Sequence, residues 1–353
     1  MFFKIFFYAM LFTACSKNHP AGETINHPPV TMADTALYKM IPFPIGAAVS
    51  VSLLQNNILY NNVVAKEYNS ITPENAMKFG SLHKSQNTFN FTEGDYIVTY
   101  AQTNGKRVHG HNLIWHQSLP SWVTGFAGDS TAWENLMKTH IQTVVSHFKS
   151  KVVSWDVVNE AFNDDGTLRN SIWLQKLGSD YIARCFQYAH ESDPDALLFY
   201  NDYGNEYSSL KRTAIVNLVT NFKNRGVPIH GIGMQFHTTY TQSDANISAA
   251  IKTAGATGLK VHLSELDVRL NPTASQTATY TAISGEQQAA RYKFIVQTYN
   301  SLPAGQKFGI TTWNVGDADS WIPSWQGAPD WPLPFDGKYL RKPAYAAIIT
   351  GAK

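Results

Sequence analysis

The chain has 353 residues, of which 44% are hydrophobic and 15% are charged, and its formal net charge is +2. This length and composition allow one large domain or two ordinary ones, with an ample core. Because the net charge is small and the Lys and Arg residues are scattered, we expect neither a nucleic-acid-binding face nor a polybasic membrane patch. Aromatic residues make up 13% of the chain. Most should fill the core, which leaves some for flat stacking surfaces in a cleft.

The first residues have the pattern of an export signal. Lys4 precedes an apolar run, residues 5–12, that is too short to span a bilayer. The segment LFTAC resembles the lipobox of bacterial lipoproteins, although Phe12 stands where a smaller aliphatic residue is usual. We therefore expect a signal over residues 1–15, with two outcomes open. Either Cys15 becomes a lipidated N-terminus on the outside of the cell envelope, or the signal is cleaved and the protein is secreted.

Residues 16–37 are rich in Pro, Asn, Thr and His, and they are predicted to form a polar tether to one domain over residues 38–353. If Cys15 is lipidated or removed, Cys185 has no partner in the chain, so the exported domain folds without a disulfide. Cys185 lies in the helical pattern YIARCFQYAH and should be a small core residue.

Short β-branched or aromatic runs alternate with amphipathic segments along the predicted domain. The predicted strands are residues 44–49, 67–72, 106–114, 151–158, 196–201, 229–236, 260–266 and 307–312. The predicted helices include residues 131–148, 174–191, 208–223 and 286–300. Eight strands that alternate with helices predict an α/β fold, a single (β/α)8 TIM barrel. The alternative, an open doubly wound sheet, would need a Gly-rich phosphate turn after an early strand, which the sequence lacks.

Polar residues gather at the carboxyl ends of the predicted strands, where barrels of this kind carry their reacting groups. Glu160 ends the fourth strand in WDVVNEAF, and Glu265 ends the seventh in HLSELDV. Two carboxyls across a cleft are suited to breaking a glycosidic bond, because one protonates the leaving oxygen while the other attacks the sugar carbon. The alternative is that each glutamate forms an ion pair with Lys or Arg at the rim.

Glycoside cleavage requires surroundings that separate the pKa values of the two carboxyls. Glu160 follows two valines and adjoins the neutral Asn159, which should leave it poorly solvated. Glu265 is expected to accept a hydrogen bond from His237 of the sixth strand, with Asp267 holding the imidazole.

Seven segments together resemble the glycoside hydrolase family 10 endo-β-1,4-xylanases in order and approximate spacing, over residues 40–350. They are ENAMKF, HGHNLIWH, WDVVNEAF, YNDY, GIGMQFH, HLSELDV and TTWNVGDADSW. The resemblance implies that Glu160 is the general acid/base and Glu265 the nucleophile, with His237 and Asp267 adjusting the nucleophile. It also implies an endo-acting, retaining hydrolase of xylan that uses no metal and no cofactor, and we expect a monomer.

The resemblance assigns sugar-binding roles to ten further side chains. They are a polar clamp on the non-reducing side (Glu74, Asn75 and Lys78, with His111 and Trp115), two amides at the cleavage site (Asn159 and Gln235), two aromatic walls (Trp313 and Trp321) and a leaving-side stacking residue (Tyr203).

Several positions depart from the family pattern, among them one in KPAYAAI, which lacks an aromatic residue common near the end of the last helix. The family usually has WHSQLP where this chain has WHQSLP, so Ser118 replaces a binding glutamine and Gln117 lies one place early. Gly204 follows YNDY where the family has Asn, which affects the leaving side. Asn314 in WNVGD adds a side chain close to the Trp313 wall.

Histidines 109, 111 and 116 allow a rival interpretation, a zinc hydrolase, because an H-x-H pair at a strand end can bind metal. His237 and Asp267 would be the further ligands. Known metal barrels carry H-x-H on the first strand, whereas here it is on the third, so we expect no metal site.

Two other rivals keep the barrel and change the activity. A barrel that only binds polysaccharide would be expected to lack one of the glutamates, and both are present. A β-1,4-glucanase is the closer competitor, since xylose differs from glucose by the missing hydroxymethyl group. Rejection of glucose would depend on how tightly the tryptophans close over C5.

Overall fold

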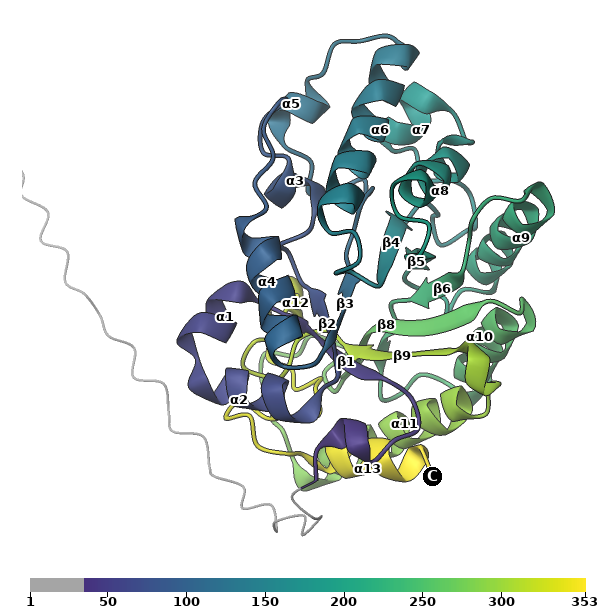
Figure 1. Cartoon of the computed structure of the whole chain (residues 1–353). Helices are drawn as coiled ribbons and strands as arrows, with labels where there is room; N and C mark the ends of the chain where they lie inside the picture. The colour runs from purple at the N-terminus through teal and green to yellow at the C-terminus, as the bar shows by residue number, and fades with distance from the viewer. Residues whose placement is uncertain (1–34) are drawn as a thin grey trace, which may run out of the picture.

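The computed structural model describes residues 35–353, in which strands and helices alternate (Figure 1). The strands are β1 Ile45–Val49, β2 Ser70–Pro73, β3 Arg107–Gly110, β4 Ser154–Asn159, β5 Leu197–Asp202, β6 Gly231–Met234, β7 His237–Thr239, β8 Lys260–Arg269 and β9 Lys307–Thr312. The α-helices are α1 Val51–Asn56, α2 Ile58–Glu67, α3 Phe79–Leu82, α4 Thr92–Thr103, α5 Ser121–Thr124, α6 Ser130–His147, α7 Ile172–Leu177, α8 Tyr181–Ser192, α9 Ser209–Arg225, α10 Asp244–Ala256, α11 Ala282–Asn300, α12 Ile322–Gln326 and α13 Pro343–Gly351. Two 3₁₀ turns, η1 Leu37–Lys39 and η2 Ala304–Gln306, complete the described elements.

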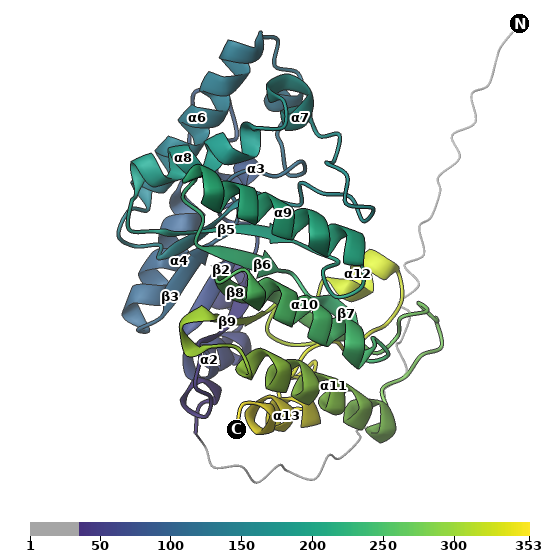
Figure 2. The ribbon, with the colours of Figure 1, turned by 90° about the vertical axis from the view of Figure 1, so that its right-hand side faces the viewer.

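The strands form a closed parallel barrel. Strands β1 to β6 pair in sequence order, β9 joins β1 to β8, and the pairing of β6 with β8 closes the sheet. The long helices pack outside, and Figure 2 shows α9, α10 and α11 as neighbouring rows on one flank. The same view shows α12 and β7 at the end of the barrel toward which the strands run. The predicted (β/α)8 barrel is therefore confirmed.

Side-chain caps explain where several long helices begin and end. The side chains of Asp129, Ser208, Ser243 and Thr281 each accept a backbone N–H at the start of α6, α9, α10 and α11, respectively. Gly226 ends α9 with φ +68°, in the left-handed region that glycine adopts readily. Removal of one such N-terminal cap costs about 1 kcal/mol.

Several predicted elements differ from the structure in their bounds. The third strand, predicted over residues 106–114, ends at Gly110, and the seventh, predicted over residues 260–266, continues to Arg269. The sixth predicted strand, residues 229–236, is shorter, because Phe236 adopts φ +64° and interrupts it. His237 therefore lies in the separate strand β7, which pairs in register with the last residues of β8, and not in the sixth barrel strand as expected. The predicted helix 174–191 is divided into α7 and α8 at Gly178, where φ is +70°.

Aromatic side chains fill the inside of the barrel below its mouth. The rings of Phe199 and Phe308 lie 4.6 Å apart, those of His109 and His262 lie 4.7 Å apart, and all four are buried. The guanidinium of Arg107 stacks 4.0 Å from the Phe308 ring centroid. Because side chains fill the interior, only the mouth is left to hold a ligand.

The folded body begins slightly earlier than the predicted boundary at residue 38. Leu37, which the sequence places in the tether, is fully buried, and its amide donates to Glu67 Oε2 at 2.8 Å. Residues 1–34, with the predicted signal and most of the tether, lie outside the described residues. From residue 35 onward, no helix is both long and apolar enough to cross a membrane. Cys185 is buried and unbridged, as predicted for a core residue.

Candidate active site

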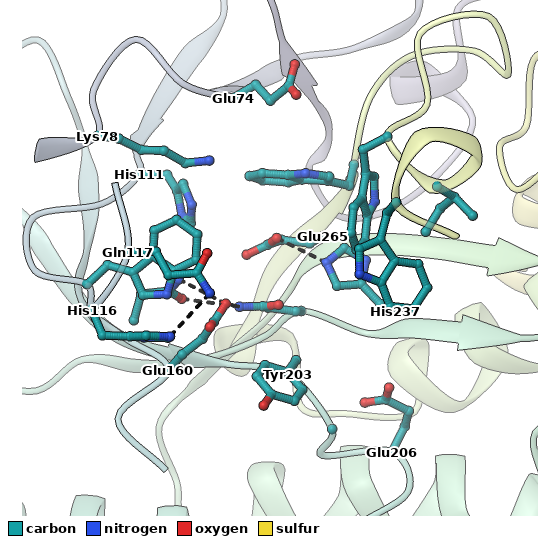
Figure 3. A pocket seen from close by; sticks show the side chains of 18 of the residues that line it. Glu74, Lys78, His111, His116, Gln117, Glu160, Tyr203, Glu206, His237 and Glu265 are labelled. Carbon is teal, nitrogen blue, oxygen red and sulfur yellow. Dashed lines mark hydrogen bonds and ion pairs between the residues drawn. The ribbon is translucent and has the colours of Figure 1, made fainter. Parts of the chain in front are cut away.

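A cavity of about 600 Å³ opens at the carboxyl ends of the strands, and Glu160 and Glu265 both point into it (Figure 3). Of the predicted site residues, all except Asn75 and Asp267 line this cavity. Asp267 is buried directly behind His237, and Asn75 is exposed, where its Oδ1 accepts a hydrogen bond from Lys78 Nζ at 2.9 Å. Asn75 therefore orients Lys78 and is not itself part of the cavity wall.

Glu265 is held between a histidine and an amide. The residue is 4% exposed and lies within β8. Oε2 lies 3.2 Å from His237 Nε2, and Oε1 accepts a hydrogen bond from Asn201 Nδ2 at 2.8 Å. Both oxygens are thus fixed before any substrate arrives.

The charge of His237 sets the protonation state of Glu265. His237 Nδ1 lies 2.7 Å from Asp267 Oδ2, because β7 and β8 pair with these two residues in register. Burial alone would lower the pKa of His237, but Asp267 and then Glu265 raise it to about 10. Burial alone would likewise raise the pKa of Glu265, but the hydrogen bond from His237 and the charges of His111 and His237 bring it below its usual value. At neutral pH the pair is an imidazolium beside an ionised carboxylate.

Glu160 has different surroundings. It directly follows β4 and adopts φ +57°, with its amide donating to the Asn201 carbonyl at 2.9 Å. Its side chain is half-buried, and Oε1 accepts hydrogen bonds from Gln235 Nε2 at 2.9 Å and from Asn159 Nδ2 at 3.3 Å. Both of these donors are neutral amides, in contrast to the imidazolium beside Glu265.

Arg169, which the sequence analysis missed, ties Glu160 to the leaving side. Its Nε donates to the Glu160 carbonyl at 3.0 Å, and its Nη2 donates to the Phe162 carbonyl at 3.2 Å and to the Tyr203 hydroxyl at 2.9 Å. Lys211 Nζ lies 3.3 Å from the Tyr203 ring centroid. Tyr203 is thus fixed by one cation at its hydroxyl and another against its ring, and neither cation belongs to a motif that marks it in the sequence.

The H-x-H pair, His109 in β3 and His111 directly after it, contacts a buried carboxylate. His109 Nε2 lies 3.0 Å from Asp156 Oδ1, and His111 Nδ1 lies 2.9 Å from Asp156 Oδ2. Burial alone would raise the pKa of Asp156, but the two histidines hold it well below its usual range. Within residues 35–353, no group of three or more His, Cys, Asp or Glu side chains is arranged to hold a metal ion.

Tryptophans wall the cavity, as the resemblance implies. Trp313 packs against His111 with ring centroids 5.1 Å apart, and Trp321 Nε1 donates to Asp267 Oδ2 at 3.1 Å. Asn314, one of the departures from the family pattern, accepts a hydrogen bond from the Trp321 amide at 3.2 Å. This substitution therefore helps to fix the Trp321 wall.

Other residues also line the cavity although the sequence analysis did not assign them to the site; it named only His116, Gln117 and Gly204, for other reasons. Besides Arg169, they are His116, Gln117, Gly204, Glu206, Tyr207, Arg269, Ile322 and Trp325. Gln117 reaches the cavity although it lies one place early, whereas Ser118 does not line it. Burial raises the pKa of Glu206 to about 7, and neither of its carboxyl oxygens has a hydrogen-bond partner among the described residues.

Sequence and structure comparisons agree on the kind of protein. The pattern of glycosyl hydrolase family 10 matches residues 34–351. Endo-1,4-beta-xylanase B of Paenibacillus barcinonensis is 38% identical over 319 residues, which cover 87% of this chain and 95% of that protein. Exoglucanase XynX of Acetivibrio thermocellus is 39% identical over 325 residues, which cover 88% of this chain but only 29% of that protein. The chain thus spans less than a third of the length of this second relative.

A solved structure has the same fold. The crystal structure of the xylanase TsXylA from Thermoanaerobacterium saccharolyticum matches with a TM-score of 0.83 and 37% identity, over 89% of this chain and 98% of that one. Together with the family match over nearly all of the described residues, this means that the chain belongs to glycosyl hydrolase family 10.

Proposed function

We propose that the protein is an endo-1,4-β-xylanase that cleaves internal xylosidic bonds with retention of configuration, with Glu265 as nucleophile and Glu160 as acid/base. The observation that carries the proposal is the charge difference across the cavity. The pKa of Glu265 is lowered beside a protonated His237, while Glu160 accepts hydrogen bonds from neutral amides. Support for xylan as substrate comes from the relatives, one of which is named an endo-1,4-beta-xylanase and another of which forms a complex with xylotetraose.

The reaction would proceed in two displacements. In the first, the ionised Glu265 attacks the anomeric carbon while Glu160 gives its proton to the leaving oxygen. In the second, Glu160 takes a proton from water, and that water displaces Glu265 from the sugar. His237 stays protonated throughout, so that Glu265 is ionised before it attacks and leaves again as a carboxylate when water displaces it.

The name of the Acetivibrio relative makes a glucanase the competing activity. The test is hydrolysis of linear xylan, carboxymethylcellulose and mixed-linkage β-glucan, with the products separated by size and the first anomer identified by proton NMR. We expect short xylo-oligosaccharides from within the chain, released first as the β-anomer. Faster cleavage of either glucan would overturn the substrate, and an initial α-anomer would overturn the mechanism.

Attachment to the cell envelope is part of the proposal, although Cys15 lies outside the described residues. Its support is the lipobox-like LFTAC at the end of an apolar run. Two or more acyl chains on Cys15 would anchor the enzyme stably, whereas one chain anchors only marginally. Cys15→Ala should release the enzyme into the soluble fraction, and an unmodified N-terminus beyond Cys15 in the mass spectrum of the native protein would contradict lipidation.

The enzyme is further proposed to act as a monomer. Glu160, Glu265 and His237 already meet in a cavity formed within one chain, so the proposed reaction requires no second copy. Light scattering of the purified protein should give the mass of a single chain, and a concentration-independent dimer would contradict this.

A further inference from the structure

Arg269 is a cation in the cavity whose donors are not used. It is the last residue of β8, it is half-buried, and it lines the cavity. Within residues 35–353 its guanidinium makes no ion pair with a carboxylate and no hydrogen bond to a backbone or side-chain acceptor. A half-buried guanidinium without an acceptor is suited to a ligand that brings one.

The other Lys and Arg residues of the cavity are already engaged. Lys78 donates to Asn75 Oδ1, and its Nζ lies 5.2 Å from the Trp115 ring centroid. Arg169 donates to two backbone carbonyls and to one hydroxyl. Among the cations that line the cavity in the described part of the chain, Arg269 is therefore the one left to recognise an anion.

An exposed indole supports Arg269. The guanidinium carbon lies 5.3 Å from the ring centroid of Trp325, and that ring lies 5.3 Å from the ring of Trp321. Trp325 is 61% exposed and belongs to the short helix α12, which ends at Gly327 with φ +69°. The aromatic surface thus continues from the Trp321 wall to the rim of the cavity, where a sugar ring can stack.

The carboxyls that line this cavity form no ion pair with the Arg269 guanidinium in the described part of the chain. Burial raises the pKa of Glu206 to about 7, so this carboxyl is mostly neutral in mildly acidic solution. Asp267 and Glu265 share the charge of the protonated His237. In mildly acidic solution Glu206, Glu265, Asp267 and His237 together therefore carry a single net negative charge, which is less repulsive to an anionic ligand than three ionised and unpaired carboxyls would be.

We propose that Arg269 and Trp325 form a binding site for an acidic side group of xylan, with the guanidinium pairing with a uronate carboxylate and the indole stacking against the sugar ring that carries it. The proposal rests on the proposed xylanase function. The planar guanidinium matches a carboxylate with two parallel hydrogen bonds, a geometry that Lys cannot reproduce. The site would favour substituted segments of the polymer over unsubstituted ones.

The test compares glucuronoxylan with the same polymer after reduction of its carboxyls to alcohols. The two polymers have similar size and branching and differ in charge. For the wild-type enzyme, we expect kcat/KM to be about tenfold higher on the native polymer, the size of effect expected for one charge-assisted pair. This ratio should fall as salt is added, because the site is open to solvent.

Three variants separate charge from stacking. Arg269→Met keeps an aliphatic chain on Trp325 but removes the charge, so the ratio should fall to about one, and Arg269→Lys should recover only part of it. Trp325→Ala should slow cleavage of both polymers. Arg225→Met is the matched control, because Arg225 ends α9 away from the cavity and pairs with Asp180 on the surface. It should leave the ratio unchanged.

The outcomes are distinct. A wild-type ratio near one, or a ratio that Arg269→Met leaves unchanged, would overturn the uronate site while leaving the xylanase function intact. If the wild type cleaves neither polymer and no linear xylan, the proposed function itself fails.

Discussion

Glu265 and Glu160 point into one cavity, yet a charged imidazole contacts the carboxyl of the first, whereas the carboxyl of the second accepts hydrogen bonds from neutral amides. Glu265 is nearly inaccessible, and it contacts His237, which in turn contacts Asp267. Glu160 is half-buried, and its carboxyl accepts hydrogen bonds from the amides of Asn159 and Gln235. The carboxyl of Glu265 therefore has a fixed cation at one of its oxygens, and the carboxyl of Glu160 accepts its hydrogen bonds from uncharged groups.

The backbone conformations of the two glutamates also differ. Glu265 lies within a strand, but Glu160 adopts a left-handed conformation with φ +57°. Such a conformation costs on the order of 1–3 kcal/mol for a residue other than glycine, so the surroundings must hold it. The Asn201 carbonyl accepts a hydrogen bond from the Glu160 amide, and Arg169 donates to the Glu160 carbonyl. The Glu265 amide donates to the Gln235 carbonyl at 3.0 Å, so backbone contacts hold both glutamates, but only at Glu160 do they maintain a left-handed conformation.

The largest expected effect comes from Glu265→Gln. The variant keeps the shape of the side chain but has no attacking oxygen, so hydrolysis of xylan and of activated aryl xylosides should both fall by about 10⁴-fold or more, equivalent to about 5 kcal/mol. Initial rates on both substrates, with circular dichroism to verify folding, check this. Retention of activity on the aryl substrate would mean that Glu265 is not the nucleophile.

Glu160→Ala should slow the hydrolysis of xylan much more than that of an activated aryl xyloside, whereas Glu265→Gln should slow both equally. Loss of the general acid should slow xylan hydrolysis by about 10³-fold, within the usual range for acid/base groups. An aryl xylobioside with a good leaving group needs little protonation, so its first step should survive and the glycosyl-enzyme should accumulate.

Added azide should then restore turnover of Glu160→Ala and give a β-xylobiosyl azide, because azide attacks without losing a proton. Glu160→Gln is the control, since its side chain fills the space that azide would occupy. Rescue of a Glu265 variant with an α-azide product would reverse the two roles.

The positions of both glutamates followed from the sequence because parallel strands bring their carboxyl ends to one mouth. The last predicted strand, residues 307–312, coincides with β9, and the expected contact of His237 with Glu265 is present. Asn75 is the predicted sugar-binding residue that lies off the cavity wall, because motif position does not determine which way a loop side chain turns.

The missed residues depend on contacts between distant parts of the chain. Arg169 reaches Tyr203 across a loop, and Arg269 meets Trp325 from a different βα unit. Loop conformations of this kind are set by tertiary packing and not by local propensity. The break at Phe236 has the same origin, since no glycine marks the positive φ there.

A smaller effect is expected from His237→Gln. The variant removes the charge of the imidazolium but keeps a side chain that can donate a hydrogen bond, so the direction in which the pH profile moves shows whether the charge matters. The charge of His237 lowers the pKa of Glu265, so without it that pKa rises and Glu265 becomes protonated at a higher pH. The acidic limb of the kcat/KM profile should therefore move to higher pH. The rate at the optimum should fall by roughly ten- to a hundredfold, as expected for the loss of one charge-assisted hydrogen bond.

Asp267→Asn is the companion variant for His237→Gln. Apart from burial, Asp267 is the largest influence on the pKa of His237, and it raises it. Its removal should move the acidic limb in the same direction by a smaller amount. A limb that stays in place in both variants would mean that the imidazolium does not control Glu265.

The smallest effect is expected from a change at Arg169. It tests whether the hydrogen bond from Arg169 to the Glu160 carbonyl positions Glu160 for catalysis. Arg169→Met removes the bonds to the Glu160 and Phe162 carbonyls and to Tyr203, so xylan hydrolysis should slow by about tenfold because Glu160 is less well positioned. Tyr203→Phe is the matched control, since it removes one of these bonds and keeps the stacking ring. If Arg169 acts through the backbone of Glu160, Arg169→Met should lower kcat on xylan more than on an aryl xylobioside, whereas Tyr203→Phe should mainly raise KM. Equal losses in both variants and on both substrates would mean that Arg169 only supports the Tyr203 ring. The functional difference between Glu160 and Glu265 would then come from the charges next to their carboxyls and not from how their backbones are held.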